Sequence, residues 1–299
     1  MYALRMAFAL VALLASSCGG GLGGATPRPT RLAEATANVT PAPPPTVAAA
    51  TANPTPVPTP PVASATGYSF LSVQTARGTF SVHLIKERLS DVSVKTLTAN
   101  ADVCRAECPV KPLARYVEEG GAYAGINGTY FCPPDYLACA GKVNSSDYAV
   151  YNSALPRWVN LPALFGNNAV LTFNGSLATA YRRQGAYTQG PAWNQPITAG
   201  ISMYPLLLQG GAIVNTEARQ SAAQLQRNTK GAIGIDGTHV YLALVLSASL
   251  TDTAAVLQAL GAKDALNLDG GGTAAMYIGG SYKVGPGREL PNAIVLTRP

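Results

Sequence analysis

The sequence is poor in residues from which several common sites are built. It contains only 2 histidines in 299 residues, and His83 and His239 are not spaced as metal ligands. This argues against a catalytic zinc centre and leaves few ways to assemble a Ser/His/Asp triad. Phosphate-binding P-loop and dinucleotide-binding motifs are also missing, because the glycine triplet Gly270–Gly272 lacks the lysine and the helix start that they require.

Charge is scarce as well. Charged residues make up 12% of the chain, and none occurs between Glu34 and Arg77. Lys and Arg together number 21 against 15 acidic residues, which gives a net charge of +6. The basic residues are scattered, so the clustered basic face of a nucleic-acid-binding protein is not present. We therefore expect no nucleic-acid partner, and the charge balance favours small anionic ligands.

Long hydrophobic runs are absent from the N-terminal region. The apolar run Ala7–Ala15 follows Arg5 and is too short to span a bilayer, a pattern typical of an export signal. Two serines then precede Cys18, which resembles the end of a bacterial lipoprotein signal, although Leu14 lies one position upstream of the usual aliphatic residue. We expect a signal peptide at 1–17, a lipid anchor on Cys18 and an extracytoplasmic, membrane-bound protein; a plain secretory signal is the alternative.

Two segments follow the signal. Residues 18–67 are rich in Pro, Ala and Thr, a composition that cannot bury a core and predicts an extended, disordered linker. Residues 68–299 are long enough for one substantial hydrophobic core. We therefore expect a single folded domain on a tethered linker; the sequence gives no indication of oligomeric state.

Four cysteines lie close together in the domain. In an exported chain an even set predicts two disulfides, whose pairing spacing alone does not decide. A structural zinc site with all four as ligands is the competing interpretation. The four residues are Cys104, Cys108, Cys132 and Cys139.

Most of the domain has the pattern of antiparallel sheets. Alternating apolar and polar residues predict strands, and several pairs of strands flank two-residue turn signals. These pairs flank Asn174-Gly175, Asp236-Gly237 and Gly279-Gly280. Two helices are expected: one from Pro112 to a left-handed end at Gly120, and one that opens with a capping box at Ser249. The predicted fold class is α+β, mostly antiparallel sheets with a few short helices.

The strongest candidate site is the turn after the predicted strand Ala265–Leu268. Asp269 is followed by Gly270, Gly271, Gly272 and Thr273, and consecutive glycine amides can form a concave site for an anionic oxygen. A tight turn in which Asp269 bonds its own backbone is the simpler alternative. Arg227 and Arg288 stand beside turns near strands, where a guanidinium could pair with phosphate.

Taken together, the segments resemble the phosphodiester glycosidase family. The resemblance covers roughly Thr79 to Leu296 and rests on four ordered motifs, with Thr273 where the family usually has Ser. The residues that carry it are Asn127, Gly128, Tyr130 and Phe131, then Arg227 with Gly231–Gly234, then Leu268–Thr273, and last Arg288 with Asn292.

The resemblance implies hydrolysis of a sugar-1-phosphodiester or phosphorylated glycan. It suggests Asp269, Arg227 and Arg288 as catalytic residues. It suggests as substrate-binding residues Asn127, Gly128, Gly270, Gly271, Gly272, Thr273 and Asn292. No cofactor is expected: Ca²⁺ could bind near Asp269, but the sequence shows no loop of oxygen ligands for it. A non-catalytic module for phosphate-bearing glycans and a phosphodiesterase that cuts the P–O bond are the alternatives.

Overall fold

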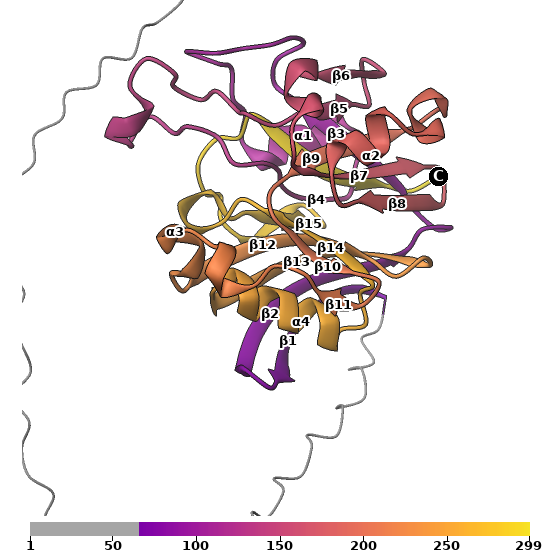
Figure 1. Ribbon diagram of the computed structural model, residues 1–299, viewed down its shortest axis with the longest axis vertical. Helices are drawn as coiled ribbons and strands as arrows, with labels where there is room; N and C mark the ends of the chain where they lie inside the picture. The colour runs from indigo at the N-terminus through magenta and orange to yellow at the C-terminus, as the bar shows by residue number, and fades with distance from the viewer. Residues whose placement is uncertain (1–65) are drawn as a thin grey trace, which may run out of the picture. The chain divides into compact units, whose positions relative to one another are not determined.

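The computed structural model describes residues 66–299 (Figure 1). The expected signal peptide, the Cys18 anchor and all but the last two residues of the expected linker lie outside this part. The first strand begins at Gly67, one residue before the predicted start of the domain. Within residues 66–299, the strands form three sheets in which every pairing is antiparallel, and four α-helices accompany them. This confirms the predicted α+β fold class.

A seven-stranded sheet is the middle layer of the molecule. Its strand order is β1-β2-β13-β12-β14-β10-β11. Strands β12 and β13 form a hairpin, whereas β2 comes from a distant part of the chain, so its pairing with β13 in the centre of the sheet is long-range. The strands are β1 (Gly67–Thr75), β2 (Gly78–Arg88), β13 (His239–Ala248), β12 (Asn228–Ile235), β14 (Asp264–Leu268), β10 (Leu206–Gln209) and β11 (Ala212–Ile213).

Helix α4 (Leu250–Ala259) covers one face of this sheet, as Figure 1 shows below the central strands. Ser249 caps it through the predicted capping box with Asp252, and Gly261 follows in a left-handed conformation. The helix is buried over most of its length, chiefly against strands β1, β10, β11 and β13. Each fully buried leucine there contributes about 1.5–3 kcal/mol relative to an exposed one.

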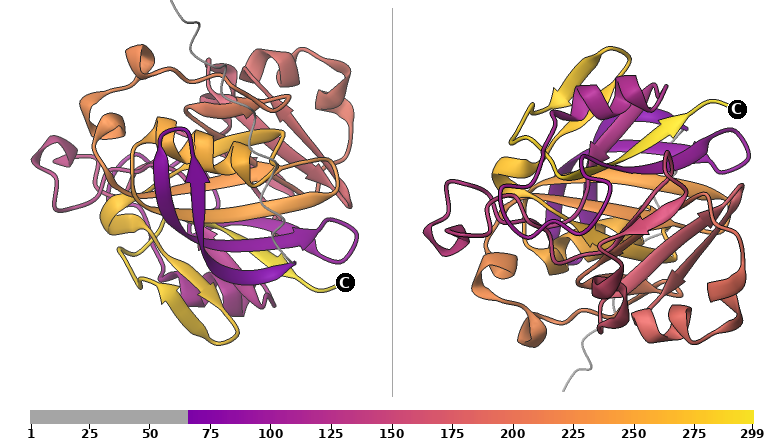
Figure 2. Two further views of the ribbon diagram at one scale, coloured as in Figure 1. Left: turned by 90° about the horizontal axis from the view of Figure 1, so that it is seen from below. Right: turned by 90° about the horizontal axis from the view of Figure 1, so that it is seen from above.

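The opposite face packs against two five-stranded sheets, which meet it over the main hydrophobic core. The first has the order β16-β15-β4-β17-β3 and the second β6-β5-β9-β7-β8. Figure 2 shows this layering from two further sides. The first sheet contains β3 (Ser93–Thr98), β4 (Ala124–Asn127), β15 (Met276–Ile278), β16 (Ser281–Val284) and β17 (Asn292–Thr297). The second contains β5 (Val150–Asn152), β6 (Arg157–Val159), β7 (Ala169–Asn174), β8 (Leu177–Tyr181) and β9 (Ala199–Met203).

The three other α-helices are short. Helix α1 (Leu113–Glu119) buries Leu113, Tyr116 and Val117 on one face, as their spacing predicts. Its left-handed end is Gly121 (φ +61°), not Gly120, which stays helical and caps the last turn. Helix α2 (Gln184–Thr188) covers β7 and β8, and helix α3 (Ala222–Leu225) precedes β12.

The hairpin turns follow the predicted pattern with one shift. Gly279 and Gly280 both have positive φ between β15 and β16, the geometry of a two-residue turn. In the β7–β8 hairpin, Asn174 pairs with Leu177, so Gly175 and Ser176 form the turn and Asn174 belongs to the strand. Strands β4, β5, β6, β9, β10 and β11 have no counterpart in the sequence prediction.

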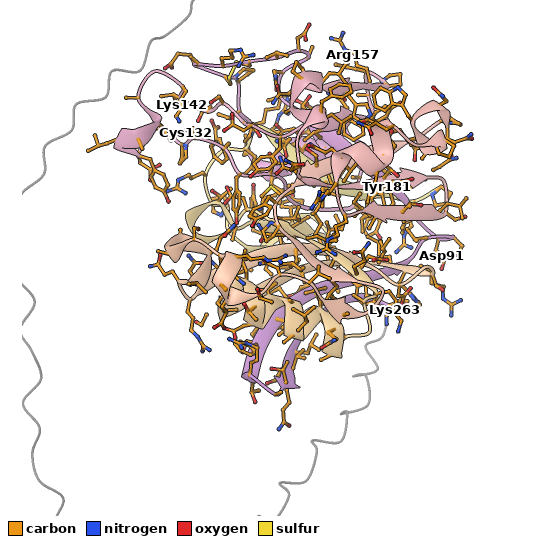
Figure 3. All side chains as sticks on the ribbon, viewed as in Figure 1. Asp91, Cys132, Lys142, Arg157, Tyr181 and Lys263 are labelled. Carbon is orange, nitrogen blue, oxygen red and sulfur yellow. A yellow bond between two sulfur atoms is a disulfide. The ribbon has the colours of Figure 1, made fainter. Side chains whose placement is uncertain are left out.

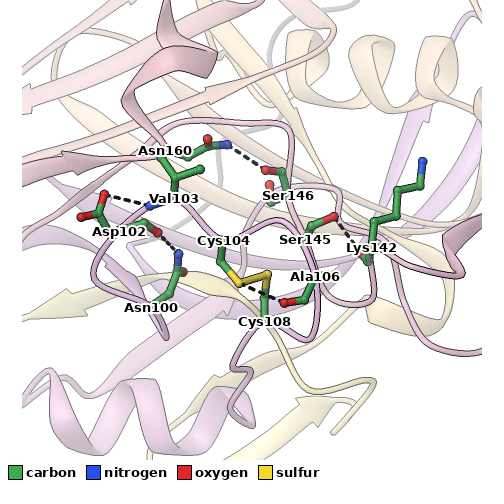
Figure 4. Close-up of a disulfide and its surroundings, with 10 residues drawn as sticks. All are labelled: Asn100, Asp102, Val103, Cys104, Ala106, Cys108, Lys142, Ser145, Ser146 and Asn160. Carbon is green, nitrogen blue, oxygen red and sulfur yellow. Dashed lines mark hydrogen bonds between the residues drawn. A yellow bond between two sulfur atoms is a disulfide. The ribbon is translucent and has the colours of Figure 1, made fainter.

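The four domain cysteines form two disulfides, Cys104–Cys108 and Cys132–Cys139. The pairing is sequential, and the zinc alternative is excluded for these thiols because they are bonded to each other. Figure 4 shows the first bridge beside Asn160, whose side-chain amide donates to the Ser146 carbonyl. Figure 3 places Cys132 in a loop that projects from the edge of the domain.

The described part of the chain has neither a membrane-spanning helix nor a metal-binding cluster of side chains. Over residues 66–299, no helix combines the length and apolar character needed to cross a membrane. In the same residues, no three His, Cys, Asp or Glu side chains are grouped so as to hold a metal ion.

Candidate active site

A cavity of about 300 Å³ opens where strand β14 ends. Asp269, the residue after that strand, lines it, and among the described lining residues it is the one carboxylic acid. The cavity brings together several residues suggested by the sequence: Asp269, Gly270, Gly271, Gly272, Thr273 and Arg288. It does not include Asn127, Gly128, Asn292 or Arg227.

The Asp269 backbone is held from both sides by the end of β4. Its N–H donates to the Gly128 carbonyl at 2.9 Å, and its carbonyl accepts from Asn127 Nδ2 at 2.8 Å. Asn127 is fully buried, and its Oδ1 accepts from the Ala275 N–H at 3.1 Å. Asn127 and Gly128 therefore hold the Asp269 backbone in place without lining the cavity themselves.

Gly128 and Asn292 form the next layer of this support. A Cβ on Gly128 would lie 1.9 Å from Asn292 Oδ1, so no side chain fits there. The Asn292 amide is committed to Thr129: Oδ1 accepts from the Thr129 N–H at 2.9 Å, and Nδ2 donates to its hydroxyl at 2.8 Å. Both sequence-suggested residues thus pack the strand ends, and neither faces the cavity.

The Asp269 carboxyl is withdrawn from water but reachable from the cavity. Burial raises its pKa to about 7. The Gly270 N–H, 2.8 Å from Oδ1, opposes this rise, as do the Thr273 hydroxyl and the charges of Arg288 and Lys230. A carboxyl with a pKa near neutrality exchanges a proton readily, which is the property required of a general acid or base.

The three glycines permit close approach at this turn. A Cβ on Gly270 would lie 2.4 Å from the Thr229 carbonyl of the neighbouring strand β12, and Gly271 has φ +58°. The Gly270 amide is already used by the Asp269 carboxylate, as the tight-turn interpretation foresaw. The expected anion-binding amides are therefore reduced to those of Gly271 and Gly272.

Arg288 supplies one positive charge at the cavity wall. It comes from the loop between β16 and β17, where its N–H donates to the Gly272 carbonyl. Its Nη1 lies 3.3 Å from the Thr273 hydroxyl and its Nη2 lies 2.6 Å from Asp135 Oδ2, while the guanidinium stacks over Tyr136. Asp135 and Tyr136 belong to the loop closed by the Cys132–Cys139 disulfide.

Lys230 is a cavity cation that the sequence analysis missed. It lies in β12, is 7% exposed, and donates from Nζ to the Ala223 carbonyl at 3.1 Å. Burial lowers its pKa, and the Asp269 carboxylate opposes that change. The sequence offered one indication of it: Lys230 is a basic residue that lies between Arg227 and the glycine-rich stretch Gly231–Gly234.

Arg227 itself points elsewhere. Its Nη2 lies 3.2 Å from Asp252 Oδ2 in helix α4, and its guanidinium lies over the Phe80 ring at 5.7 Å. Asp252 also accepts from Arg77 Nε at 2.7 Å. The two guanidinium groups suggested from the sequence therefore do not meet at Asp269; Arg288 and the Lys230 ammonium do.

Aromatic rings form another part of the wall. Tyr130 lines the cavity, and its hydroxyl accepts from Asn267 Nδ2 at 2.7 Å. Burial raises its pKa to about 12, so it remains a neutral hydrogen-bonding group. Phe131, Pro133 and Tyr136 continue the wall toward the rim. An apolar wall opposite charged groups suits a ligand with both a ring face and an anionic end.

The cavity thus places a carboxyl with a raised pKa beside two cationic side chains. The family model for phosphodiester glycosidase matches residues 120–297. The chain belongs to this family. No curated protein sequence matches it.

Two solved structures share the fold. One is the catalytic domain of zebrafish N-acetylglucosamine-1-phosphodiester alpha-N-acetylglucosaminidase, in a form auto-inhibited by its pro-peptide. It matches with a TM-score of 0.59 at 16% identity, and the match covers 78% of this chain and 83% of that one. A hypothetical protein from Synechocystis matches with a TM-score of 0.55 at 19% identity, covering 78% of this chain. The present chain spans 62% of the Synechocystis protein's length. At these identities the likeness establishes the fold alone.

Proposed function

We propose that the protein is a hydrolase that cleaves the glycosidic bond of a sugar-1-phosphodiester in the cell envelope. The observation that carries this proposal is the convergence of a desolvated carboxyl, a guanidinium and an ammonium group in one cavity: Asp269, Arg288 and Lys230. Family membership gives the reaction class, and the cavity supplies groups suited to it.

The cations suit the departure of a phosphate. When the bond between the anomeric carbon and the phosphate oxygen breaks, its electron pair goes to the phosphate, which leaves as a phosphate monoester. This product is already anionic, with a second pKa near 6, so it needs charge neutralisation more than protonation. Arg288 provides that charge next to Thr273 and Gly272, and Lys230 provides it from β12 in the same cavity.

Asp269 suits activation of water. In its ionised form it accepts a proton from a water molecule whose oxygen bonds to the anomeric carbon. A pKa of about 7 keeps a substantial fraction ionised at neutral pH while leaving the carboxylate basic enough to take the proton. Negative charge beside the reacting carbon also stabilises its oxocarbenium-like transition state. Asp269 therefore acts as the general base in this proposal.

We place this activity outside the cytoplasm. Disulfides persist in oxidising compartments, and the domain holds two. The sequence pattern before Cys18 further suggests anchorage by lipid. Metabolic labelling with a fatty acid, present in the full-length protein and lost in Cys18→Ala, would support the anchor; equal labelling of both would contradict it.

The test uses the full-length protein with a panel of sugar-1-phosphodiesters, reading the reducing sugar released. Asp269→Asn should lose most turnover. Asp264→Asn is the matched control, because Asp264 begins strand β14, which Asp269 follows, lies outside the cavity and accepts a hydrogen bond from the Gly210 N–H. Wild-type turnover in Asp269→Asn, or binding without product, would overturn the proposal.

Oxygen-18 water separates the two bonds that could be cut. The proposal requires the label on the sugar, since water attacks the anomeric carbon. Label on the phosphate would instead establish P–O cleavage and a phosphodiesterase.

A further inference from the structure

A second cavity, of about 320 Å³, lies between the seven-stranded sheet and the sheet that contains β7 and β9. Its wall contains three arginines and two asparagines, one of which is Asn215. We call this cavity the arginine cleft and define it by Arg182, Arg183, Arg219 and Asn215. Arg182 and Arg183 follow β8, whereas Asn215 and Arg219 follow β11. A neighbouring hollow of about 570 Å³ is also lined by Arg182 and Arg183, so the basic surface continues along α2.

The described part of the chain supplies no carboxylate to neutralise the arginine cleft. Among these residues, no acidic side chain lines either hollow. Within residues 66–299, none of its three arginines has a carboxylate oxygen within 4.0 Å. The acid nearest in sequence to Arg219 is Glu217, and it is paired with Arg77 at 2.5 Å. Three guanidinium groups at one concave surface favour an anion with several acceptor oxygens.

Asn215 gives an independent indication that the arginine cleft binds a ligand. It is 4% exposed, and its Nδ2 has no hydrogen-bond partner among the described residues. Buried donors in native proteins are nearly always paired. A donor of this kind in the wall of a basic cleft is suited to an oxygen of a bound ligand.

The arginine cleft adjoins the candidate active site. The segment 215–224 separates the two: Asn215 and Arg219 line the cleft, and Ser221, Ala223 and Gln224 line the first cavity. Tyr204 also joins them, because its carbonyl accepts from Asn267 Nδ2, which donates as well to the Tyr130 hydroxyl in the wall of the first cavity. The two cavities are therefore linked through one buried side chain, Asn267.

We propose that the arginine cleft binds a second phosphate of the same phosphate-bearing glycan whose glycosyl phosphate enters the first cavity. The assignment to a glycan rests on the proposed function; the assignment to a phosphate rests on the cleft alone. Nucleic acid is disfavoured because the described residues give the cleft a single aromatic ring for stacking, Tyr204, whose hydroxyl donates to the Arg219 carbonyl.

Binding is measured by calorimetry with the full-length protein and glycerol phosphate oligomers that carry one, two, four or eight phosphates. In the wild type, affinity should rise steeply once an oligomer can occupy both sites at once. Removing three charge-assisted contacts in R182Q/R183Q/R219Q should weaken binding of the longer oligomers by about tenfold or more.

The matched control is R88Q/R105Q/K142Q, which removes the same number of charges at exposed positions outside the arginine cleft. Thermal melting establishes that both triple variants are folded. Equal weakening in the two would show a net-charge effect and overturn the proposal, as would unchanged binding in the cleft variant. Tighter binding of an oligothymidylate with the same phosphate count would reassign the cleft to nucleic acid and also overturn it.

The experiments distinguish failure of the proposed hydrolase function from failure of the proposed phosphate site. If no sugar-1-phosphodiester is hydrolysed but R182Q/R183Q/R219Q still loses phosphate binding, the phosphate site stands and its glycan assignment falls. If hydrolysis is confirmed, kcat/KM for a substrate with two phosphates should fall more in this variant than kcat/KM for a substrate with one. An equal change for both substrates would overturn the glycan assignment.

Discussion

Asn127 offers the sharpest test of how the site is built, because the sequence suggested a substrate contact and the structure buries it behind Asp269. Asn127→Ala removes both of its hydrogen bonds and leaves the Asp269 carbonyl and the Ala275 N–H without partners. Each unpaired buried group costs about 1–3 kcal/mol, so unfolding free energy should fall by about 2–6 kcal/mol. A shift of about 1 Å in the Asp269 carboxylate should also lower kcat by about 10²-fold, with KM little changed.

Urea unfolding and steady-state kinetics measure these effects, with Asn174→Ala as the control because Asn174 is exposed. Asn127→Asp gives a second readout. A protonated carboxyl can restore both hydrogen bonds, whereas the ionised form cannot donate and is buried without a counter-charge. Its stability deficit should therefore shrink as the pH is lowered from 8 to 5, and the deficit of Asn127→Ala should not. A raised KM at unchanged kcat and stability in Asn127→Ala would refute the positioning role.

Three further outcomes are expected. Because burial raises the pKa of Asp269 to about 7, kcat/KM should rise with pH through about 7. Unfolding free energy should fall between about pH 4 and 7 by at most about 4 kcal/mol, since the native state keeps a proton that the unfolded chain releases; urea unfolding of Asp269→Asn should lack this fall. Asp135→Asn should lower KM about threefold by freeing Arg288 from an exposed ion pair for substrate phosphate, and a raised KM would contradict this. Arg288→Gln should lower kcat/KM by about 10²-fold or more, because it removes a charge that faces the leaving phosphate. Arg227→Gln should lower kcat/KM by less than about threefold. A larger loss in Arg227→Gln than in Arg288→Gln would show that Arg227, and not Arg288, acts in the site.

Local signals in the sequence were sufficient for elements that local interactions determine. The Ser249 capping box marks where helix α4 begins, and the Gly279-Gly280 turn marks where β15 ends and β16 begins. Helix α4 and the β15–β16 hairpin could therefore be predicted. Strands β9 and β10 could not, because they are short, almost fully buried on both faces and lack the alternation that marks a half-buried strand.

The confusion between Arg227 and Lys230 has a similar cause. The pairing of β12 with β13 shifts between Asn228 and Lys230, so the strand does not keep a simple alternation at its start. Sequence spacing therefore did not indicate which of the two basic residues faces Asp269. The segment that contains Arg227 and Lys230 could be recognised as part of the site, but the direction of its side chains depends on this shift in strand pairing.

The position of Asp269 shows why the site depends on the whole domain. Strand β14 belongs to the seven-stranded sheet, whereas β4, which ends in Asn127, belongs to the sheet of β15 and β17. The two hydrogen bonds from Asn127 and Gly128 to the Asp269 backbone therefore join two different sheets at the point where the carboxylate is presented. These residues are separated by about 140 positions, and no local pattern reveals their contact. It follows that substitutions which loosen the packing between the two sheets should reduce the precision of the site before they unfold the domain.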